Sequence, residues 1–468
     1  MNIDFILVNK IKNALFECKT GEILVSNKFE LKTIFGKNGH AEINPHELWK
    51  DVEMSIDYVV DKFINLNYSV DQIKSIGITN HVSSTFCWNK TNEKFYCNAL
   101  IWYDSRNNKI LEKIVEKNGK NLFIEKTGMP LLNTSSFSKI MWILQNFPEC
   151  CMDIESNQAI FGTPDTWLIW TYIFSHRPGW EKLLYIINTN AKKLTNGNHF
   201  TDMTNAAITG LFDINSLKWS EDICSFYGIP MSILPKIKEC LDDFGIANVS
   251  KLKGIPIRAV ISDHCASLYG QQCTQPGLAK LTVGTGGCIS YNIGKEGCVN
   301  CTGSVNDWLI KKLGIAKSFE ELENLASSVT SSEGVYFITG FSGIYTPYWN
   351  HNVKGTLFGL TMDTTKAHIA RACLESVAYQ SALIINDMKK CGIKLKKLSV
   401  DGGMVKNKTF LQILTNYINE PIDTPLLLKN FDLKGTIKPK ISEAERNKNL
   451  ENWQKAINTA IEYYKIKN

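Results

Sequence analysis

Three short stretches of the sequence contain residues that could support phosphoryl transfer. One apolar stretch ends at the carboxylate Asp263, and the next is broken by Gly-Thr-Gly-Gly at residues 284–287. A third is followed by the glycine pair at residues 402–403 and then by Asn407. Glycine-rich turns leave backbone N–H groups free and let a phosphate approach closely, and the hydroxyl of Thr285 adds one donor. A carboxylate nearby could orient an acceptor hydroxyl and take its proton.

The glycine pair at residues 402–403 closes one predicted strand and opens a predicted helix. The N-terminus of that helix could hold the adenosine portion of a nucleotide through backbone contacts and the Asn407 amide. Each glycine group could also be a tight turn that binds nothing, because such turns need glycine for conformational reasons alone. The spacing of the residues leaves both interpretations open.

The surrounding sequence alternates between predicted strands and predicted helices, which favours a layered α/β fold. The predicted buried strands lie within residues 75–80, 85–90, 255–262 and 394–403. The predicted helices span residues 45–66, 368–392 and, as a charged amphipathic helix with a solvated face, 438–468.

The length of 468 residues exceeds what one hydrophobic core usually serves, so two large domains are expected. The segment at residues 242–257 is polar and punctuated by glycine, which is typical of a boundary. We place the boundary at residue 250, with an N-terminal domain over residues 1–250 and a C-terminal domain over residues 251–468.

The composition argues against several classes of function. A formal net charge of +6 is a mild excess without a long basic run, so no nucleic-acid partner is implied. No apolar run reaches the length of a membrane span, and the apolar stretch near the N-terminus is too short for a secretion signal. The sequence therefore predicts a soluble, cytoplasmic protein.

The 14 cysteines allow two explanations. Without a secretion signal, they are expected to be reduced thiols that pack as small hydrophobic side chains. The Cys-Val-Asn-Cys stretch at residues 298–301 could instead be half of a zinc site or a redox pair, although no second pair of ligands stands at metal spacing.

Longer stretches of the sequence resemble the FGGY family of carbohydrate kinases, and within that family the glycerol kinases. The matching segments follow the family order over nearly the whole chain, which makes them more specific than any single motif. They are GITN (77–80), GTPDTWLIW (162–170), LTNGNHFTDMTNA (194–206), SDHCASLYGQ (262–271), TVGTGG (282–287), GFSGIYTPYW (340–349), KGTLFGLT (354–361) and VDGGMVKN (400–407). Two signature regions of the family are approximated by KIMWIL (139–144) and by GTLFGL (355–360) with HIARACLES (368–376) behind it.

The resemblance implies two actin-like, ribonuclease H-like α/β domains with an interdomain cleft that binds ATP and a polyol. It implies a Mg²⁺- and ATP-dependent phosphorylation of glycerol, or of a hydroxyl in a related small polyol or sugar, within carbohydrate or glycerol metabolism. It also suggests a homo-oligomer.

The resemblance assigns the polyol side of the site. Asp263 matches the general base that deprotonates the polyol hydroxyl, and it is the residue expected beside Mg²⁺. Trp102 matches an aromatic wall of the pocket, and Thr134 stands where the family has an aromatic side chain. His264, where the family usually has glutamine, could bond a substrate hydroxyl or have only a structural role.

The resemblance also assigns the nucleotide side. Asp307 falls where the family has a nucleotide-contacting glutamine, so an acid replaces an amide there. The expected nucleotide contacts are Gly284, Thr285, Gly286, Gly303, Asp307, Gly403 and Asn407.

Some positions depart from the family pattern. Where the family has an Asp-containing turn that grips phosphate and magnesium, this chain has Lys10 and Lys12, which could attract phosphate or be solvated surface lysines. Where glycerol kinases have Gln-Arg-Glu, it has His81, Val82 and Ser83. The second replacement removes groups that bind glycerol hydroxyls, so we expect weaker glycerol binding.

Three segments differ in length from the family. Residues 172–192 have no counterpart, a β-rich stretch is missing near residue 295, and a small-residue helix is missing near residue 426. Losing a buried element would expose a large apolar surface. Either the fold has compensated, or the written sequence differs from the expressed protein.

The sequence leaves two functions open. The first is an active kinase, supported by Asp263 and by both glycine motifs. The second is a non-catalytic pseudokinase that binds nucleotide or a protein partner. The absent phosphate turn, together with Val82 and Ser83, supports this second function.

Overall fold

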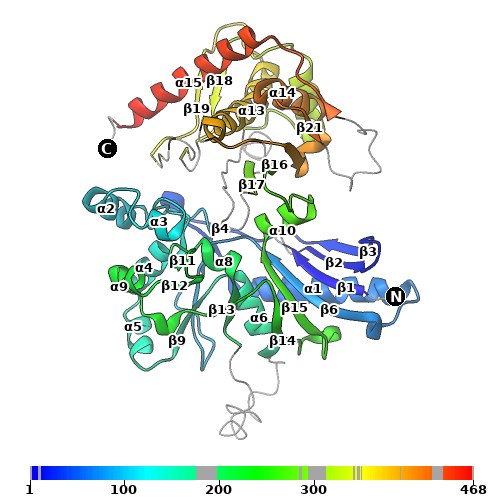
Figure 1. Ribbon diagram of the computed structural model, residues 1–468, viewed down its shortest axis with the longest axis vertical. Helices are drawn as coiled ribbons and strands as arrows, with labels where there is room; N and C mark the ends of the chain where they lie inside the picture. Colours follow the sequence, from blue (N-terminus) through cyan, green and yellow to red (C-terminus); the bar gives the residue numbers. More distant parts are fainter. Residues whose placement is uncertain are drawn as a thin grey trace, which may run out of the picture. The chain divides into compact units, whose positions relative to one another are not determined.

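The computed structural model consists of two compact units, Met1–Ala266 and Ser267–Asn468, each with its own sheet and helices (Figure 1). The division falls at Ala266 rather than near residue 250, because the strand that ends at Ser262 pairs within the sheet of the first unit. The structure describes residues 3–8, 12–174, 198–283, 287–292, 313–340, 343–344, 348, 350, 352–390, 392–423 and 436–465.

A six-stranded sheet forms the centre of the first unit, in the order β14-β15-β6-β1-β2-β3. β1, β6 and β15 run parallel, whereas the neighbouring pairs β14–β15, β1–β2 and β2–β3 are antiparallel. This is the ribonuclease H-like pattern, so the α/β fold expected from the sequence is confirmed. The strands are β1 (Ile3–Val8), β2 (Lys12–Glu17), β3 (Ile23–Lys28), β6 (Ile73–Asn80), β14 (Leu241–Ile246) and β15 (Pro256–Ser262).

Helix α1 (Pro45–Asn65) packs its apolar face on this sheet. The helix begins where the Asn44 side chain accepts hydrogen bonds from the N–H groups of His46 (3.0 Å) and Glu47 (3.2 Å), with proline in the first turn. Its buried apolar side chains recur at helical spacing and are Leu48, Val52, Ile56, Val59, Val60 and Phe63.

Shorter elements complete the first unit around a second buried cluster that contains Phe137, Phe161 and Tyr227. The strands are β4 (Ile34–Phe35), β5 (Ala41–Ile43), β7 (Phe86–Asn89), β8 (Ala99–Leu100), β9 (Ala159–Gly162), β10 (Phe200–Asp202), β11 (Phe212–Asp213), β12 (Lys218–Trp219) and β13 (Lys236–Lys238). The helices are α2 (Asn108–Asn118), α3 (Ile124–Thr127), α4 (Ser136–Asn146), α5 (Pro148–Glu155), α6 (Pro164–Phe174), α8 (Met203–Ala207) and α9 (Glu221–Tyr227). Helix α10 (Asp263–Gly270) follows β15 directly and crosses the division between the units.

The second unit contains a five-stranded sheet in the order β17-β16-β20-β21-β22. β16, β20 and β21 are parallel neighbours, and the two edge strands run antiparallel to them. The strands are β16 (Leu278–Val283), β17 (Gly287–Tyr291), β20 (Lys397–Asp401), β21 (Ile422–Asp423) and β22 (Thr436–Ile437), with β18 (Tyr336–Ile338) and β19 (Thr356–Phe358) as a separate pair. The helices are α12 (Phe319–Ser327), α13 (Lys366–Lys390), α14 (Lys408–Ile418) and α15 (Glu443–Lys465).

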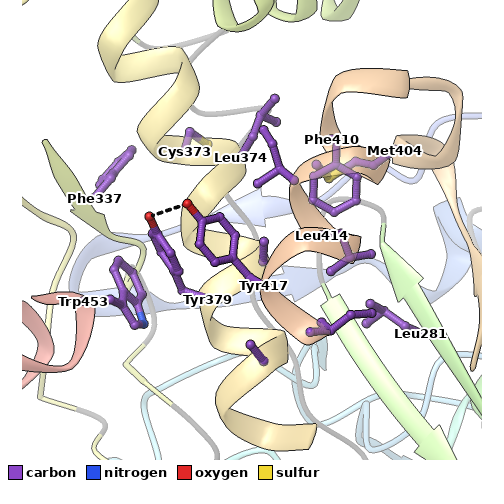
Figure 2. Packing of buried hydrophobic residues seen from close by; sticks show 14 of the residues in the cluster. Leu281, Phe337, Cys373, Leu374, Tyr379, Met404, Phe410, Leu414, Tyr417 and Trp453 are labelled. Atoms are coloured by element: carbon purple, nitrogen blue, oxygen red, sulfur yellow. Dashed lines mark hydrogen bonds between the residues drawn. The ribbon is translucent and has the colours of Figure 1, made fainter. Parts of the chain in front are cut away.

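Three aromatic side chains from three helices meet in the core of the second unit (Figure 2). Tyr379 of α13 lies 4.5 Å from Tyr417 of α14 and 5.3 Å from Trp453 of α15, measured between ring centroids. The two tyrosine hydroxyls are 3.4 Å apart and hydrogen-bonded. The C-terminal helix is therefore anchored in the core through Trp453. Its charged side chains are exposed or partly exposed except for the buried Arg446, whose Nε donates a hydrogen bond to the carbonyl of Asn416 at 2.8 Å.

The predicted secondary structure agrees well with the observed elements. The strands expected at residues 75–80, 85–90, 255–262 and 394–403 correspond to β6, β7, β15 and β20, and the three expected helices to α1, α13 and α15. Within the described ranges no helix is long and apolar enough to cross a membrane. The ten cysteines whose side chains the structure describes form no disulfide with one another, whereas Cys298 and Cys301 lie outside the described residues.

Candidate active site

Two parallel strands of the first unit end side by side and carry the central residues of the candidate site. Asn80, the last residue of β6, pairs in register with Ser262, the last residue of β15. His81 and Asp263 follow these two residues, so they leave the sheet at the same edge. The pairing therefore brings together two residues that are far apart in the sequence.

Asp263 is the first residue of α10, and 24% of its side chain is exposed. Its Oδ1 accepts a hydrogen bond from the N–H of His264 at 2.9 Å and lies 3.9 Å from His264 Nε2. Burial lowers the pKa of the neighbouring His81 imidazole, while the charge of Asp263 acts in the opposite direction. The site thus combines a solvent-accessible carboxylate with a histidine that is neutral at pH 7.

The turn after β6 is held by hydrogen bonds on several sides. Ser83 has a φ of +64°, in the left-handed region, and its hydroxyl donates to the carbonyl of Ile208 at 3.2 Å. The hydroxyl of Ser84 accepts from the N–H of Trp102 at 3.1 Å. The backbone of the expected aromatic wall is therefore tied to the turn that replaces the Gln-Arg-Glu run, and the Ser83 hydroxyl already has a protein partner.

The backbone at Thr134 is fixed by a buried lysine from α4. Lys139 Nζ donates hydrogen bonds to the carbonyls of Asn133 (3.0 Å) and Thr134 (2.7 Å). Burial lowers the pKa of Lys139 to about 7, although the charge of Asp104 opposes this shift. The sequence analysis quoted Lys139 only as part of the segment 139–144 and assigned it no role. The residues around it in the sequence do not show that this lysine is buried.

Two further carboxyl groups, Asp165 and Asp202, are fully buried near the end of β10. Asp165 Oδ2 accepts a hydrogen bond from the hydroxyl of Thr201 at 2.6 Å. Burial, with the nearby charge of Asp202 as the second cause, raises the pKa of Asp165 to about 7. Sequence analysis quoted the segments that contain both residues but assigned them no role, since their proximity depends on the packing of α6 against β10.

Replacing Asp165 by asparagine should flatten the dependence of stability on pH. The pKa of Asp165 is raised from 3.8, so between about pH 4 and pH 7 the folded state binds more protons than the unfolded state, and stability falls as the pH rises. Over this window we expect the free energy of unfolding of the wild type to fall by roughly 2–4 kcal/mol more than that of Asp165→Asn. Urea titrations at a series of pH values measure both, and parallel profiles would contradict the expectation.

The glycine pair of the second unit lies at the end of β20. Gly402 has a φ of +98°, which favours glycine, and residues Gly403–Lys406 form a short 3₁₀ helix before α14. Asn407 caps α14, because its Oδ1 accepts from the N–H of Phe410 at 2.6 Å. Because Asn407 Oδ1 is bonded within the cap, a ligand at this turn would contact backbone N–H groups and the amide nitrogen of Asn407.

The second glycine loop follows the neighbouring strand. β16 and β20 are parallel, and Thr282 pairs with Asp401 at the same ends of these strands. The loop residues Gly284, Thr285 and Gly286 lie outside the described residues, as do Gly303, Asp307 and Lys10. Lys12 begins β2.

The described residues thus place the expected polyol contacts and the expected nucleotide contacts on different units. On the first unit, backbone pairing and hydrogen bonds connect the turn after β6 with Asp263 and Trp102. On the second unit, Gly403 and Asn407 follow one strand end. Among the residues described, no group of three or more Asp, Glu, His or Cys side chains could by itself hold a metal ion.

Comparisons with known proteins match both units to one family. The family model for the N-terminal domain of the FGGY family of carbohydrate kinases matches residues 8–176 and 180–270, and the model for its C-terminal domain matches residues 267–427.

Curated relatives cover most of the chain. A probable glycerol kinase from Caenorhabditis elegans is 33% identical over 444 residues, which cover 88% of this chain and 84% of the relative. Glycerol kinase 1 from Streptomyces avermitilis is 33% identical over 440 residues, which cover 87% and 82%.

Solved structures share the fold. The crystal structure of Plasmodium falciparum glycerol kinase with ADP has a TM-score of 0.78 and 26% identity, with 98% of each chain covered. A ligand-bound xylulose kinase from Lactobacillus acidophilus also has a TM-score of 0.78, at 19% identity with 100% of each chain covered, and this likeness concerns the fold alone.

Proposed function

The chain belongs to the FGGY family of carbohydrate kinases, and we propose that it transfers the γ-phosphoryl group of ATP to a hydroxyl of glycerol or a related small polyol. The observation that carries the proposal is the position of Asp263. Its carboxylate lies at the end of β15, is partly open to solvent, and stands beside the turn that follows β6. A general base of phosphoryl transfer must hold a carboxylate oxygen within hydrogen-bond reach of the substrate hydroxyl. A fixed backbone and an oxygen that the substrate can reach both serve this purpose.

In the proposed reaction, Asp263 accepts the proton of the substrate hydroxyl. The hydroxyl oxygen forms a bond to the γ-phosphorus while the bond from that phosphorus to the bridging oxygen breaks, and ADP leaves. The neutral His81 does not neutralise the charge of Asp263, as a protonated imidazole would.

ATP would bind to the second unit in this proposal. The turn at Gly402 and Gly403, with the amide nitrogen of Asn407, would contact the adenosine portion. The phosphates would contact the loop that contains Thr285. A relative of known structure was crystallised with ADP, which supports a nucleotide as the second substrate.

Magnesium would enter with ATP. The ion is usually held by one or two carboxylates together with substrate phosphates, so Asp263 and ATP oxygens suffice without a larger protein cluster. When bound, the ion would neutralise charge on the transferred phosphoryl group.

The identity of the polyol depends on the turn after β6. Val82 offers no hydrogen bond from its side chain, and the Ser83 hydroxyl is bonded to the carbonyl of Ile208. A glycerol molecule at this turn would therefore find fewer partners than in a glycerol kinase with arginine and glutamate at these positions. We expect a high KM for glycerol and a better acceptor among other small polyols or sugars.

The test is a panel of acceptors incubated with ATP and Mg²⁺, with the phosphorylated product identified by mass spectrometry. Glycerol, other three- to five-carbon polyols, xylulose and gluconate form the panel. We expect a Mg²⁺-dependent product with at least one of them. Stabilisation of the protein by ATP without any product would instead favour the non-catalytic alternative, because a ligand that binds only the folded state raises its stability.

A further inference from the structure

Four polar residues hold the ends of the two strands that carry the candidate site. We call this group, Asn80, Asp202, Thr204 and Asn205, the strand-end clamp. Asp202 and Asn205 are fully buried, and 3% of Asn80 is exposed. None of the four was assigned a role in the reaction above.

Asp202 orients the clamp by accepting hydrogen bonds at both carboxylate oxygens. Oδ2 accepts from the hydroxyl of Thr204 at 2.6 Å and from its N–H at 2.9 Å. Oδ1 accepts from Asn205 Nδ2 at 2.7 Å and from its N–H at 3.2 Å. A buried carboxylate with several donors fixes the hydrogen atoms of those donors, so the remaining lone pairs of Thr204 and Asn205 point in defined directions.

Each of the two oriented side chains then holds one strand end. The Thr204 hydroxyl accepts from the N–H of Ser262 at 2.8 Å, one residue before Asp263. Asn205 Oδ1 accepts from Asn80 Nδ2 at 2.9 Å, and the same nitrogen donates to the carbonyl of His81 at 3.1 Å. The clamp therefore fixes the backbone on both sides of the edge at which Asp263 and His81 leave the sheet.

We propose that Thr204 is a positioning residue for Asp263, acting through its hydrogen bond to the Ser262 N–H. The proposal rests on the proposed function, in which Asp263 is the general base. The Asp202 carboxylate holds the Thr204 hydroxyl as an acceptor, the hydroxyl fixes the peptide group before Asp263, and the carboxylate of Asp263 is thereby kept in place for the acceptor hydroxyl. Small displacements of a catalytic group reduce the rate without removing any contact to substrate.

Thr204→Val tests this directly, because valine keeps the shape of threonine and removes the hydroxyl. We expect kcat to fall by about 10–100-fold while KM for ATP stays within about two-fold of the wild type. Thr204→Ser restores the hydroxyl and should recover most of kcat. Thr127→Val is the matched control. The buried Thr127 hydroxyl, like that of Thr204, both donates and accepts a hydrogen bond: it donates to the carbonyl of Phe123 at 3.0 Å and accepts from the N–H of Met129 at 3.4 Å. It lies outside the group that holds Ser262.

A general loss of stability predicts a different pattern. In that case Thr204→Val and Thr127→Val would lower the unfolding midpoint alike, and kcat per folded molecule would stay near the wild-type value for both. This result would overturn the proposal. So would failure of Thr204→Ser to recover more activity than Thr204→Val.

Amide hydrogen exchange separates this proposal from the proposed function. In Thr204→Val the Ser262 N–H should exchange at least about ten-fold faster, whereas the Val260 N–H, which donates to the carbonyl of Cys240 at 2.9 Å, should keep its protection. If the wild type phosphorylates no acceptor, the proposed function fails, and the Ser262 exchange rate alone decides whether the clamp holds this strand end. Equal exchange rates at Ser262 in wild type and variant would refute the clamp, whatever the activity.

Discussion

The Asp263→Asn variant is expected to lose phosphoryl transfer by about 10²–10⁴-fold in kcat while keeping its fold. Asparagine has the shape of aspartate, and its carbonyl oxygen can still accept the hydrogen bond that Asp263 Oδ1 receives from the His264 N–H at 2.9 Å. What it cannot do is take a proton from the acceptor hydroxyl. The loss should therefore appear in kcat, measured by coupled ADP release with the best acceptor of the panel.

A surface carboxylate provides the control for this experiment. Asp71 is exposed and hydrogen-bonded to the hydroxyl of Ser69, and Asp71→Asn removes the same charge from the same unit. We expect its kcat to remain within about two-fold of the wild type, because exposed charges of this kind contribute little. Turnover that persists in Asp263→Asn at the level of Asp71→Asn would exclude Asp263 as the base.

Trp453→Ala is expected to destabilise the second unit by about 3–5 kcal/mol. The Trp453 side chain is 2% exposed, and its ring stacks on Tyr379 with an angle of 29° between the planes (Figure 2). Truncation leaves a cavity between α13 and α15 and removes most of the anchor that holds α15 on the core. Chemical denaturation followed by tryptophan and far-ultraviolet signals measures the loss.

Two variants on the same helix define the mechanism of that loss. Tyr463 is 52% exposed, so Tyr463→Ala should change the free energy of unfolding by less than about 0.5 kcal/mol. Trp453→Phe keeps an aromatic ring against Tyr379 and should recover part of the stability. If Tyr463→Ala lowered the free energy of unfolding as much as Trp453→Ala does, helix propensity rather than the buried Trp453 side chain would determine the docking of α15.

The local features of this protein could be predicted from short stretches of its sequence. Apolar runs predicted β6, β15 and β20 closely, because a strand or helix pattern depends on residues that are near one another in the chain. The acid at the end of β15 and the glycine pair after β20 could be identified as candidate chemistry for the same reason. The order of motifs along the chain also sufficed for the family, since it needs no knowledge of which segments touch.

Which of these local features lie close together depends on the packing of the strands and helices. His81 approaches Asp263 because β6 and β15 pair in parallel, and no periodicity in the sequence specifies a pairing partner. The position of the domain division also depends on that pairing, which keeps β15 in the first unit and moves the division from residue 250 to Ala266.

The buried polar groups depend on tertiary structure most strongly. Asp165 and Lys139 have pKa values near 7 because the surrounding side chains exclude water, and the sequence does not show which charged residues will be enclosed. Thr204 reaches the Ser262 N–H only when α8 packs against the end of β15. The sequence thus established the chemistry that is available, and the packing of the strands and helices determined which groups are positioned to use it.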